Sequence, residues 1–310
     1  MNGENSITET SNMWKTCGLF FEPDRGLEWS RSHAMLPTPI FIDGTWRVYY
    51  SGRNILNQSS IGYFEIDSLE NPKVVFNSPI PVLKPGELGC FDDNGVSPSC
   101  LIELGDGRLA MYYIGWNPGS TTRVNLFGGL AISHDRGRSF QRWSRAPILE
   151  RTHTDPFMNT APWVIKLTNG YVMYYVSGMK WESRDHPRYN IKIAHSQDGL
   201  NWVRKGKVVL DFCSNSETAL ARPYVVHQDN VWRMWVSSRV GNYSIAYAES
   251  KDGINWERND TRYGLSPNGS GEEKSMTEYA AVIAHDDRWM MFYNGENYGQ
   301  NGILMAVSDK

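Results

Sequence analysis

Three acidic residues of this chain lie shortly before apolar segments that are far apart in the sequence. They are Asp93, Glu217 and Glu278. Carboxyl groups that a fold brings together can act as general acid, general base or nucleophile on a glycosidic bond. One acid, with a pKa raised by burial or by a like-charged neighbour, would protonate the leaving oxygen, and an ionised one would support the positively charged anomeric centre. These three residues are therefore the candidate catalytic groups.

Other polar residues occupy similar positions and are candidates for binding a substrate. An arginine can keep a nearby carboxylate ionised or hold an anionic group through two hydrogen bonds. Trp116, Tyr175 and Trp181 could give a sugar ring an apolar face, although such aromatic residues are more often part of a core. The candidate binding residues are Arg31, His33, Arg53, Asp92, Asp155, Asn159, Arg222 and Arg239.

Each catalytic assignment has a structural alternative. The Asp-Asp-Asn-Gly segment that contains Asp93 could be a turn that caps its own backbone. Glu217 could be a buried charge partner of Arg222, and Glu278 could bond backbone amides where the two ends of the fold meet. The acidic pair at 272–273 is expected in a solvated loop.

No metal and no cofactor are predicted. The His and Cys residues lack zinc-ligand spacing, and the chain has neither a Gly-rich phosphate loop nor a Ser nucleophile elbow. The four cysteines are expected to be reduced thiols, because they show neither metal-ligand spacing nor the density of a disulfide scaffold.

The elements that position these residues recur along the chain. An aromatic-rich strand appears five times, about sixty residues apart, at 46–50, 109–113, 171–175, 232–235 and 289–293. Before it comes an apolar strand and a hairpin turn, and after it a third strand that ends in Ala-x-Ser in most periods. A fixed period of this length in a β-rich chain predicts a repeat of four-stranded units, which is typical of a propeller.

The sequence therefore predicts an all-β fold with one domain over 1–310, a five-bladed β-propeller of four-stranded antiparallel blades. The last period stops after its third strand, so the apolar segment 18–22 is predicted to complete that blade and close the ring. Ser-x-Asp turns follow the third strands and are expected to be structural. The predicted blades are 30–83, 93–145, 155–210, 217–260 and 278–310 with 18–22.

Charge and hydropathy narrow the partners. A net charge of −3 argues against a nucleic-acid or anionic-membrane surface. The polar start of the chain does not resemble a secretory signal, and no apolar run approaches the roughly 20 residues that span a bilayer. A cytoplasmic protein without membrane insertion is expected, with a small-molecule or oligosaccharide substrate.

Several motifs resemble the five-bladed glycosidase superfamily, which includes arabinanase/xylosidase-, invertase/levansucrase- and β-mannoside phosphorylase-type enzymes. They are Phe-Asp-Asp-Asn-Gly-Val-Ser-Pro-Ser at 91–99, Glu-Thr-Ala-Leu-Ala-Arg-Pro at 217–223 and the repeated Ser-x-Asp-Gly-x-x-Trp. The segment 278–299 resembles a branch associated with bacterial surface-polysaccharide synthesis. The resemblance implies an acidic role for Asp93 in the second blade and an acid on a later blade, which Glu217 fits best.

The chain departs from that superfamily in the first blade. Where the hydrolases carry an Asp, this sequence reads Arg-Ser-His-Ala-Met-Leu-Pro at 31–37. A cationic Arg31/His33 entrance suits a phosphate, which slightly favours transfer or phosphorolysis over hydrolysis. A phosphorylated or nucleotide-activated sugar is thus one option for the substrate. The alternatives are a glycoside hydrolase of the arabinanase/xylosidase type and a non-catalytic sugar-binding propeller. A six-bladed sialidase fits the Ser-x-Asp turns but not the number of periods.

Overall fold

Strands dominate the protein, whose structure is a computed structural model that describes residues 13–310. The prediction of an all-β chain is confirmed. In the described part of the chain, no helix is long and apolar enough to cross a membrane. The helical segments are η1 (Glu28–Ser30), α1 (Asp260–Tyr263), η2 (Gly271–Glu273) and α2 (Glu296–Gly299).

Consecutive strands pair antiparallel in sets of four, and each period of the aromatic repeat supplies one set. The first set is β2 (Ser32–Ile42), β3 (Thr45–Arg53), β4 (Ser59–Ile66) and β5 (Val74–Asn77). The second is β6 (Gly95–Glu103), β7 (Leu109–Pro118), β8 (Val124–Ser133) and β9 (Gln141–Arg142). The third is β10 (Asn159–Leu167), β11 (Gly170–Ser183), β12 (His186–Ser196) and β13 (Val203–Leu210). The fourth is β14 (Ala219–Gln228), β15 (Val231–Val240), β16 (Asn242–Ser250) and β17 (Trp256–Arg258).

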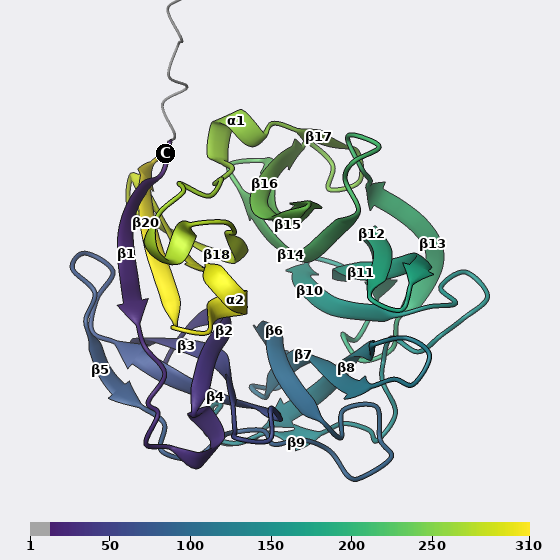
Figure 1. Cartoon of the computed structure of the whole chain (residues 1–310), viewed down its shortest axis with the longest axis horizontal. Coiled ribbons are helices and arrows are strands. Elements are labelled where there is room, and N and C mark those ends of the chain that lie inside the picture. The colour runs from purple at the N-terminus through teal and green to yellow at the C-terminus, as the bar shows by residue number, and fades with distance from the viewer. Residues whose placement is uncertain (1–12) are drawn as a thin grey trace, which may run out of the picture.

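The last set joins the two ends of the chain. The strands β18 (Glu278–His285), β19 (Arg288–Asn294) and β20 (Ile303–Asp309) pair in order, and β1 (Lys15–Phe21) pairs antiparallel with β20. The predicted pairing of the N-terminal strand with the last period is confirmed, with β1 starting earlier than the predicted segment. In Figure 1 this purple strand lies beside the yellow end of the chain.

The first strand of each set lies innermost. These strands contact one another in a cycle, β2 with β6, β6 with β10, β10 with β14, β14 with β18 and β18 with β2. Figure 1 shows them around the middle of the molecule, with the later strands of each set farther out. The cycle of contacts returns to its start, so side chains from all sets can reach one central space.

The aromatic repeat packs neighbouring sets together. The first Tyr of a Tyr-Tyr pair in β3, β7 and β11 donates its hydroxyl hydrogen to a glycine carbonyl of the Ser-x-Asp turn in the next set. The O···O distances are 2.8, 2.5 and 2.8 Å for Tyr49 with Gly137, Tyr112 with Gly199 and Tyr174 with Gly253. Apolar clusters fill the space between the sets. The aromatic pattern thus recurs because each blade-like set needs the same contact.

The Ser-x-Asp turns are held by their own side chains, as expected for structural turns. In one of them, Ser196 Oγ accepts a hydrogen bond from the Gly199 amide at 2.9 Å, and Asp198 Oδ1 accepts from the Leu200 and Asn201 amides at 2.8 Å. The same bonds recur in the turn that follows Ser250. These turns lie at the outer side of the sets, after the third strand.

Candidate active site

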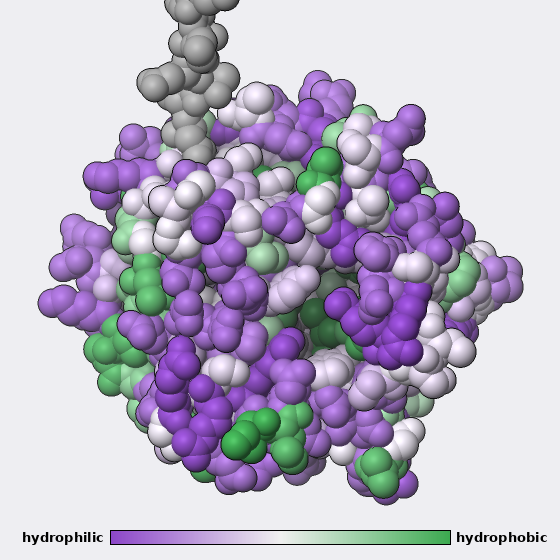
Figure 2. All heavy atoms as spheres, viewed as in Figure 1, coloured by the Kyte–Doolittle hydropathy of each residue, from purple (hydrophilic) through white to green (hydrophobic). Residues whose placement is uncertain are grey.

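A cavity of about 420 Å³ lies among the inner strands. Figure 2 shows a hollow near the middle of the face that is viewed there, with apolar side chains in its depth and hydrophilic ones around it. Among the described residues that line the cavity there is no Asp and no Glu. The polar and aromatic lining consists mainly of Arg53, Arg123, Arg222, Arg239, Trp116, Tyr189, Tyr243, Tyr279 and Tyr298.

Backbone bulges in the inner strands turn residues toward this cavity. The antiparallel pairing of β2, β6, β10, β14 and β18 with their neighbours is interrupted by a register shift in each case. Four lining residues at or beside such shifts have a positive φ, namely Leu36, Ala161, Arg222 and Tyr279, at 45 to 58°. A bulge changes which side of a strand a residue faces, and so these strands present side chains that a regular strand would turn elsewhere.

Arg222 ties three inner strands together. It is 1% exposed, and its guanidinium donates to the carbonyl oxygens of Ala280 and Pro37 at 2.6 and 2.7 Å and to Thr38 Oγ1 at 2.9 Å. Its Nε has no hydrogen-bond partner. Burial lowers the pKa of Arg222 to about 10, which leaves the group charged at neutral pH. A buried positive charge therefore stands at the wall of the cavity.

Two further arginines lie partly buried at the cavity. Arg239 donates to Thr218 Oγ1 at 3.0 Å and to the Pro187 carbonyl at 2.9 Å, and its guanidinium carbon lies 5.7 and 5.6 Å from the ring centres of Tyr189 and Tyr243. Arg53 donates to Asn57 Oδ1 at 2.9 Å, while its buried Nε has no partner. Burial lowers the pKa of Arg53.

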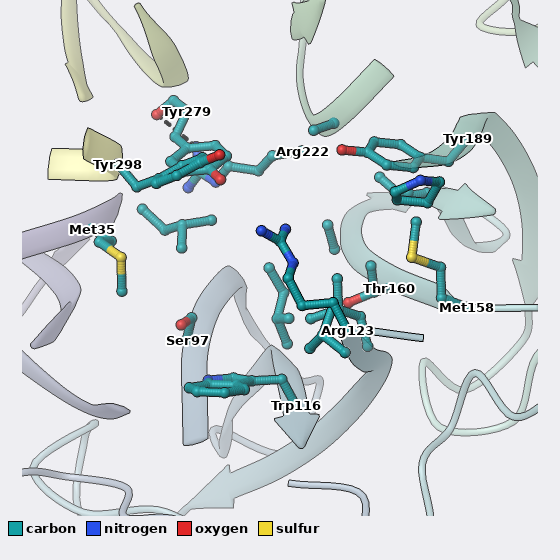
Figure 3. Close-up of a pocket in the computed structure, with 18 of the residues that line it drawn as sticks. Met35, Ser97, Trp116, Arg123, Met158, Thr160, Tyr189, Arg222, Tyr279 and Tyr298 are labelled. Carbon is teal, nitrogen blue, oxygen red and sulfur yellow. Dashed lines mark hydrogen bonds between the residues drawn. The ribbon is translucent and has the colours of Figure 1, made fainter. Parts of the chain in front are cut away.

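Arg123 is the most exposed of the four arginines. Its nearest described carboxylate oxygen, on Asp185, is 3.9 Å away, and both side chains are more than half exposed. In Figure 3 the Arg123 guanidinium reaches toward the middle of the cavity, with the rings of Trp116, Tyr189 and Tyr298 around it.

Aromatic hydroxyls complete the wall. The hydroxyls of Tyr189 and Tyr243 hydrogen-bond to each other across β12 and β16. Tyr298, in α2, is 41% exposed and stands at the edge of the cavity. The lining thus combines cationic, hydroxyl and flat apolar surfaces, which suits a polar ligand with ring faces.

Glu278 is the predicted catalytic acid that directly precedes a lining residue. It is 0% exposed, immediately precedes Tyr279, and neither of its carboxylate oxygens has a hydrogen-bond partner. Burial raises the pKa of Glu278 well above its usual range. The neighbouring Tyr279 side chain opposes part of this rise in the pKa of Glu278. The alternative in which Glu278 bonds backbone amides does not occur.

Three other predicted acids form one repeated structural contact. Asp92, Asp155 and Glu217 lie in the loops before β6, β10 and β14, and each is 0 or 1% exposed. Each pairs with an arginine that follows the Ser-x-Asp turn of its own set, at N···O distances of 2.8, 3.5 and 3.1 Å. The arginines are Arg142, Arg204 and Arg258.

Side chains of the second strands hold the same acids. Tyr113 and Tyr175 donate to Asp92 and Asp155 at 2.9 and 3.0 Å, and Ser238 donates to Glu217. Glu273 accepts from Tyr293 at 2.5 Å and is 6% exposed, so the expectation of a solvated loop was wrong for this residue. These acids are held within the sets and are absent from the described lining of the cavity.

The remaining acidic and amide candidates also lie outside the lining. Asp93 Oδ2 accepts a hydrogen bond from the Gly89 amide at 2.8 Å, which matches the structural alternative of a turn that caps its own backbone. Asn159 is buried, and its Nδ2 donates to the carbonyl oxygens of Glu150 and Asp155.

The two residues of the predicted cationic entrance, Arg31 and His33, do not line the cavity. Arg31 is exposed and donates to the Arg25 carbonyl at 3.0 Å. His33 is half-buried, and burial together with the nearby Arg53 and Arg25 lowers its pKa to about 4. Of the predicted binding residues, Arg53, Arg222 and Arg239 are brought together at the cavity, whereas Arg31 and His33 are not in its lining.

Several lining residues were not singled out from the sequence. Arg123, Tyr189, Tyr243 and Tyr298 lie after the first strand of their sets, whereas most of the residues predicted from the sequence lie in the loops before it. Trp116 was named as a possible sugar-contacting residue and does line the cavity. In the described part of the chain, no group of three or more His, Cys, Asp or Glu side chains is placed to hold a metal ion. The four cysteines are unpaired in the structure.

The protein is similar along almost its whole length to a protein of Mycobacterium tuberculosis. The two chains are 38% identical over 296 residues, which cover 95% of this chain and 98% of the relative, the uncharacterized protein Rv1502. This chain belongs to the Rv1502 family. The uncharacterized protein MT1551 of another strain matches to the same extent, and no model of a known protein family matches.

The fold of this Rv1502 family member is that of the glycoside-hydrolase propellers. A structure described as a glycoside hydrolase superposes with a TM-score of 0.72 at 21% identity, covering 95% of this chain and 91% of that one. A thermostable family-43 glycoside hydrolase superposes with a TM-score of 0.64 at 14% identity, covering 89 and 88%. The GH32 β-fructofuranosidase BmSUC1 of Bombyx mori gives 0.63 at 15% identity, covering 88% of this chain and 61% of that one. The resemblance to the glycosidase propeller superfamily is confirmed for the fold.

Proposed function

We propose that this protein is a carbohydrate-active enzyme that acts at an anomeric centre in its central cavity. The observation that carries the proposal is the cavity itself, which is about 420 Å³ in volume and is lined by arginines, tyrosines and Trp116 at the bulged inner strands. Its volume is in the range of about 300–1,000 Å³ typical of small-molecule sites. The fold shared with glycoside hydrolases supports a sugar as the ligand.

We also infer that the five four-stranded sets are five blades of one propeller and one domain, closed by β1. The pairing of β1 with β20 and the cycle of contacts among the inner strands support this arrangement. In such a propeller the axis is the place where every blade can contribute to one site.

Glu278 is the residue we assign as the source of the proton, which the hydroxyl of the adjoining Tyr279 would relay, because no carboxylate is among the described lining residues. Its burial and its unpartnered oxygens favour the neutral acid, the form that can donate a proton to a leaving oxygen. Asp93 and Glu217 were predicted as further catalytic groups from the sequence, but each already has a local structural role. Glu278 is thus the carboxyl group best supported as catalytic.

A single acid favours transfer or phosphorolysis over hydrolysis. Hydrolysis by the common mechanism needs a second carboxylate that activates water or attacks the sugar. Phosphate is itself a good nucleophile and needs only the acid. One phosphate oxygen forms a bond to the anomeric carbon while the bond from that carbon to the leaving oxygen breaks, the leaving oxygen takes the proton that Glu278 supplies, and the proton of the phosphate restores the acid. Hydrolysis remains the alternative reaction.

Glu278→Gln tests this proposal. Activity is first sought with aryl glycosides and oligosaccharides, each with water, inorganic phosphate or a second sugar as acceptor. The amide variant should lose about 10²- to 10⁴-fold in kcat/KM, the usual contribution of a general acid. It should keep the wild-type fold by circular dichroism. Full activity of Glu278→Gln would remove this residue from the mechanism.

Matched variants separate the roles of the acids. Glu257→Gln, at an exposed position, is the control and should leave activity unchanged. Asp93→Asn and Glu217→Gln test the two assignments made from the sequence alone. A non-catalytic sugar-binding propeller is the second candidate, because the described lining carries no carboxylate. It would be favoured if sugars bind but no product forms with any acceptor.

A further inference from the structure

Three of the four arginines at the cavity differ from most buried arginines of this protein in lacking an acidic partner. Arg47, Arg204 and Arg258 have side chains 3 to 14% exposed, and each pairs with a carboxylate at 3.1 Å or less. Within residues 13–310, no ion pair is found for Arg53, Arg222 or Arg239. The fold therefore pairs Arg47, Arg204 and Arg258 with carboxylates but leaves Arg53, Arg222 and Arg239 with carbonyl, hydroxyl and amide oxygens.

An unpaired buried charge destabilises a protein, because the lost hydration is not replaced by an opposite charge. The carbonyl oxygens around Arg222 satisfy hydrogen bonds but carry only partial negative charge. Glu278 does not supply the missing charge, since its burial favours the neutral acid. The cavity thus has a net positive wall that a bound anion would compensate.

The guanidinium groups also keep donors free. Arg53 uses one Nη atom for Asn57 and has an unpartnered Nε. Arg239 uses Nε and one Nη, and leaves the other. The Arg123 side chain has no described partner nearer than 3.9 Å and reaches into the cavity in Figure 3. Free N–H donors of guanidinium groups match the oxygens of phosphate and carboxylate groups.

We propose that the cavity selects a sugar that carries an oxyanion, a phosphate ester or a carboxylate, and that Arg53, Arg123 and Arg239 bind this group while Arg222 adds a fixed positive charge behind it. This inference rests on the proposed function for the sugar part of the ligand. The aromatic rings of Trp116 and Tyr298 are left to contact the uncharged faces of the sugar.

The histidine beside these arginines adds no charge to the cavity wall. Burial, followed by the charges of Arg53 and Arg25, lowers the pKa of His33 to about 4. The His33 ring is therefore neutral at physiological pH, and the positive charge of the wall comes from the arginines.

Matched sugar pairs test the proposal by thermal shift and calorimetry. The probes are glucose 6-phosphate, glucuronate and glucose, with inorganic phosphate alone as a fourth. The charged sugars should raise the melting temperature at millimolar concentration, and glucose should raise it less at the same concentration. Binding should weaken with added salt. The phosphate and carboxylate probes distinguish which oxyanion the site prefers.

Three variants identify the residues. Arg53→Met should weaken binding of the better charged sugar by about tenfold or more, the loss expected for a hydrogen bond to a charged group. Arg53→Lys keeps the charge but not the planar donors and should recover part of the affinity. Arg145→Met is the control, because Arg145 is 77% exposed and pairs with Glu87 outside the cavity lining. Arg222 is not substituted, because its hydrogen bonds connect three inner strands and their loss would destabilise the fold.

The outcomes separate this inference from the proposed function. If glucose or neutral oligosaccharides bind as tightly as the charged sugars, and Arg53→Met binds them normally, the oxyanion proposal is overturned and the sugar site stands. If inorganic phosphate binds and depends on Arg53 but none of the sugars binds better than phosphate, the anion site stands without its sugar. If neither phosphate nor a charged sugar binds, the proposal is wrong.

Discussion

Glu278 and Glu217 are both fully buried, but their carboxyl groups differ in the number of hydrogen bonds that they accept. Glu217 accepts hydrogen bonds from Arg258, Ser238 and the Cys213 amide. Glu278 accepts none, and burial raises its pKa well above the usual value of 4.5. A carboxyl group kept without partners costs stability, which is the kind of cost that functional sites carry.

The raised pKa of Glu278 predicts a pH-dependent stability. In the unfolded chain the group loses its proton near pH 4.5, whereas the folded protein keeps it to higher pH. Stability should therefore fall as the pH rises above about 4.5, by about 1.4 kcal/mol per pH unit until the folded pKa is reached. Glu278→Gln has no proton to lose and should be relatively more stable at pH 8 than at pH 5.

Urea unfolding of both proteins between pH 5 and 8 measures this effect. Other groups titrate in both proteins alike, so the difference between the two curves isolates residue 278. Parallel curves would show that Glu278 ionises normally in the folded state, and would also weaken its assignment as a neutral proton donor.

At the scale of the elements, the recurring strands and turns were predictable from the sequence. Whether an acidic side chain faces the cavity or its own set was not. The aromatic strand and the Ser-x-Asp turn are local patterns, and each requires the same residues wherever it occurs. By contrast, bulges decide which residues of an inner strand face the cavity. No residue type in the sequence predicts where these bulges occur. Thus Arg222 and Tyr279 reach the cavity, while Glu217 and Asp155 turn into their own sets.

A signal for these structural acids was nevertheless present. In the second, third and fourth sets, the aromatic residue after the Ser-x-Asp turn is followed two positions later by an arginine, as in Trp202-Val-Arg204. Each such arginine pairs with the acid in the loop before the first strand. An acid matched to a recurring arginine is a structural partner, and this pattern would have separated Asp155 and Glu217 from Glu278.

The tyrosine contacts between sets give a prediction at this scale. Tyr112→Phe and Tyr174→Phe each remove one hydroxyl that donates to a turn glycine of the next set. Each should lower the free energy of unfolding by about 1 kcal/mol, because a buried carbonyl loses its partner. The two contacts lie between different sets, so the double variant should lose about the sum.

Tyr171→Phe is the matched control, since Tyr171 is 8% exposed and no hydrogen bond of its hydroxyl is found in the described chain. It should change the stability by less than about 0.5 kcal/mol, because the ring is kept and no hydrogen bond is lost. Equal effects of all three substitutions would mean that the aromatic ring, and not the hydroxyl, holds the sets together.

For the whole molecule, the cavity depends on the two ends of the chain being joined. The strand β1 covers the edge of β20 that would otherwise be exposed, and its Phe21 ring stacks on Phe64 of the first set at 4.2 Å between ring centres. Arg222, in β14, donates to the Pro37 carbonyl of β2 and to the Ala280 carbonyl of β18. Asn294, at the end of β19, accepts a hydrogen bond from the Leu36 amide of β2. A defect at this junction should therefore reach the cavity, although β1 contributes no residue to its described lining.

Phe21→Ala tests this coupling between the junction and the cavity. Phe21 is 6% exposed and Leu19 of the same strand is 40% exposed. Phe21→Ala should cost about 3–5 kcal/mol in the free energy of unfolding, as other buried phenylalanines do when they are truncated. Leu19→Ala should cost far less.

The same substitution should also affect ligand binding in the cavity. Because Arg53 and Leu36 lie in strands of the first set that Phe21 packs against, binding should weaken in Phe21→Ala at temperatures where most of the protein is still folded. Denaturant unfolding and calorimetry on both variants measure the two quantities separately. Unchanged binding in a destabilised Phe21→Ala protein would show that the cavity is held by the inner strands alone, without help from the strand that joins the ends.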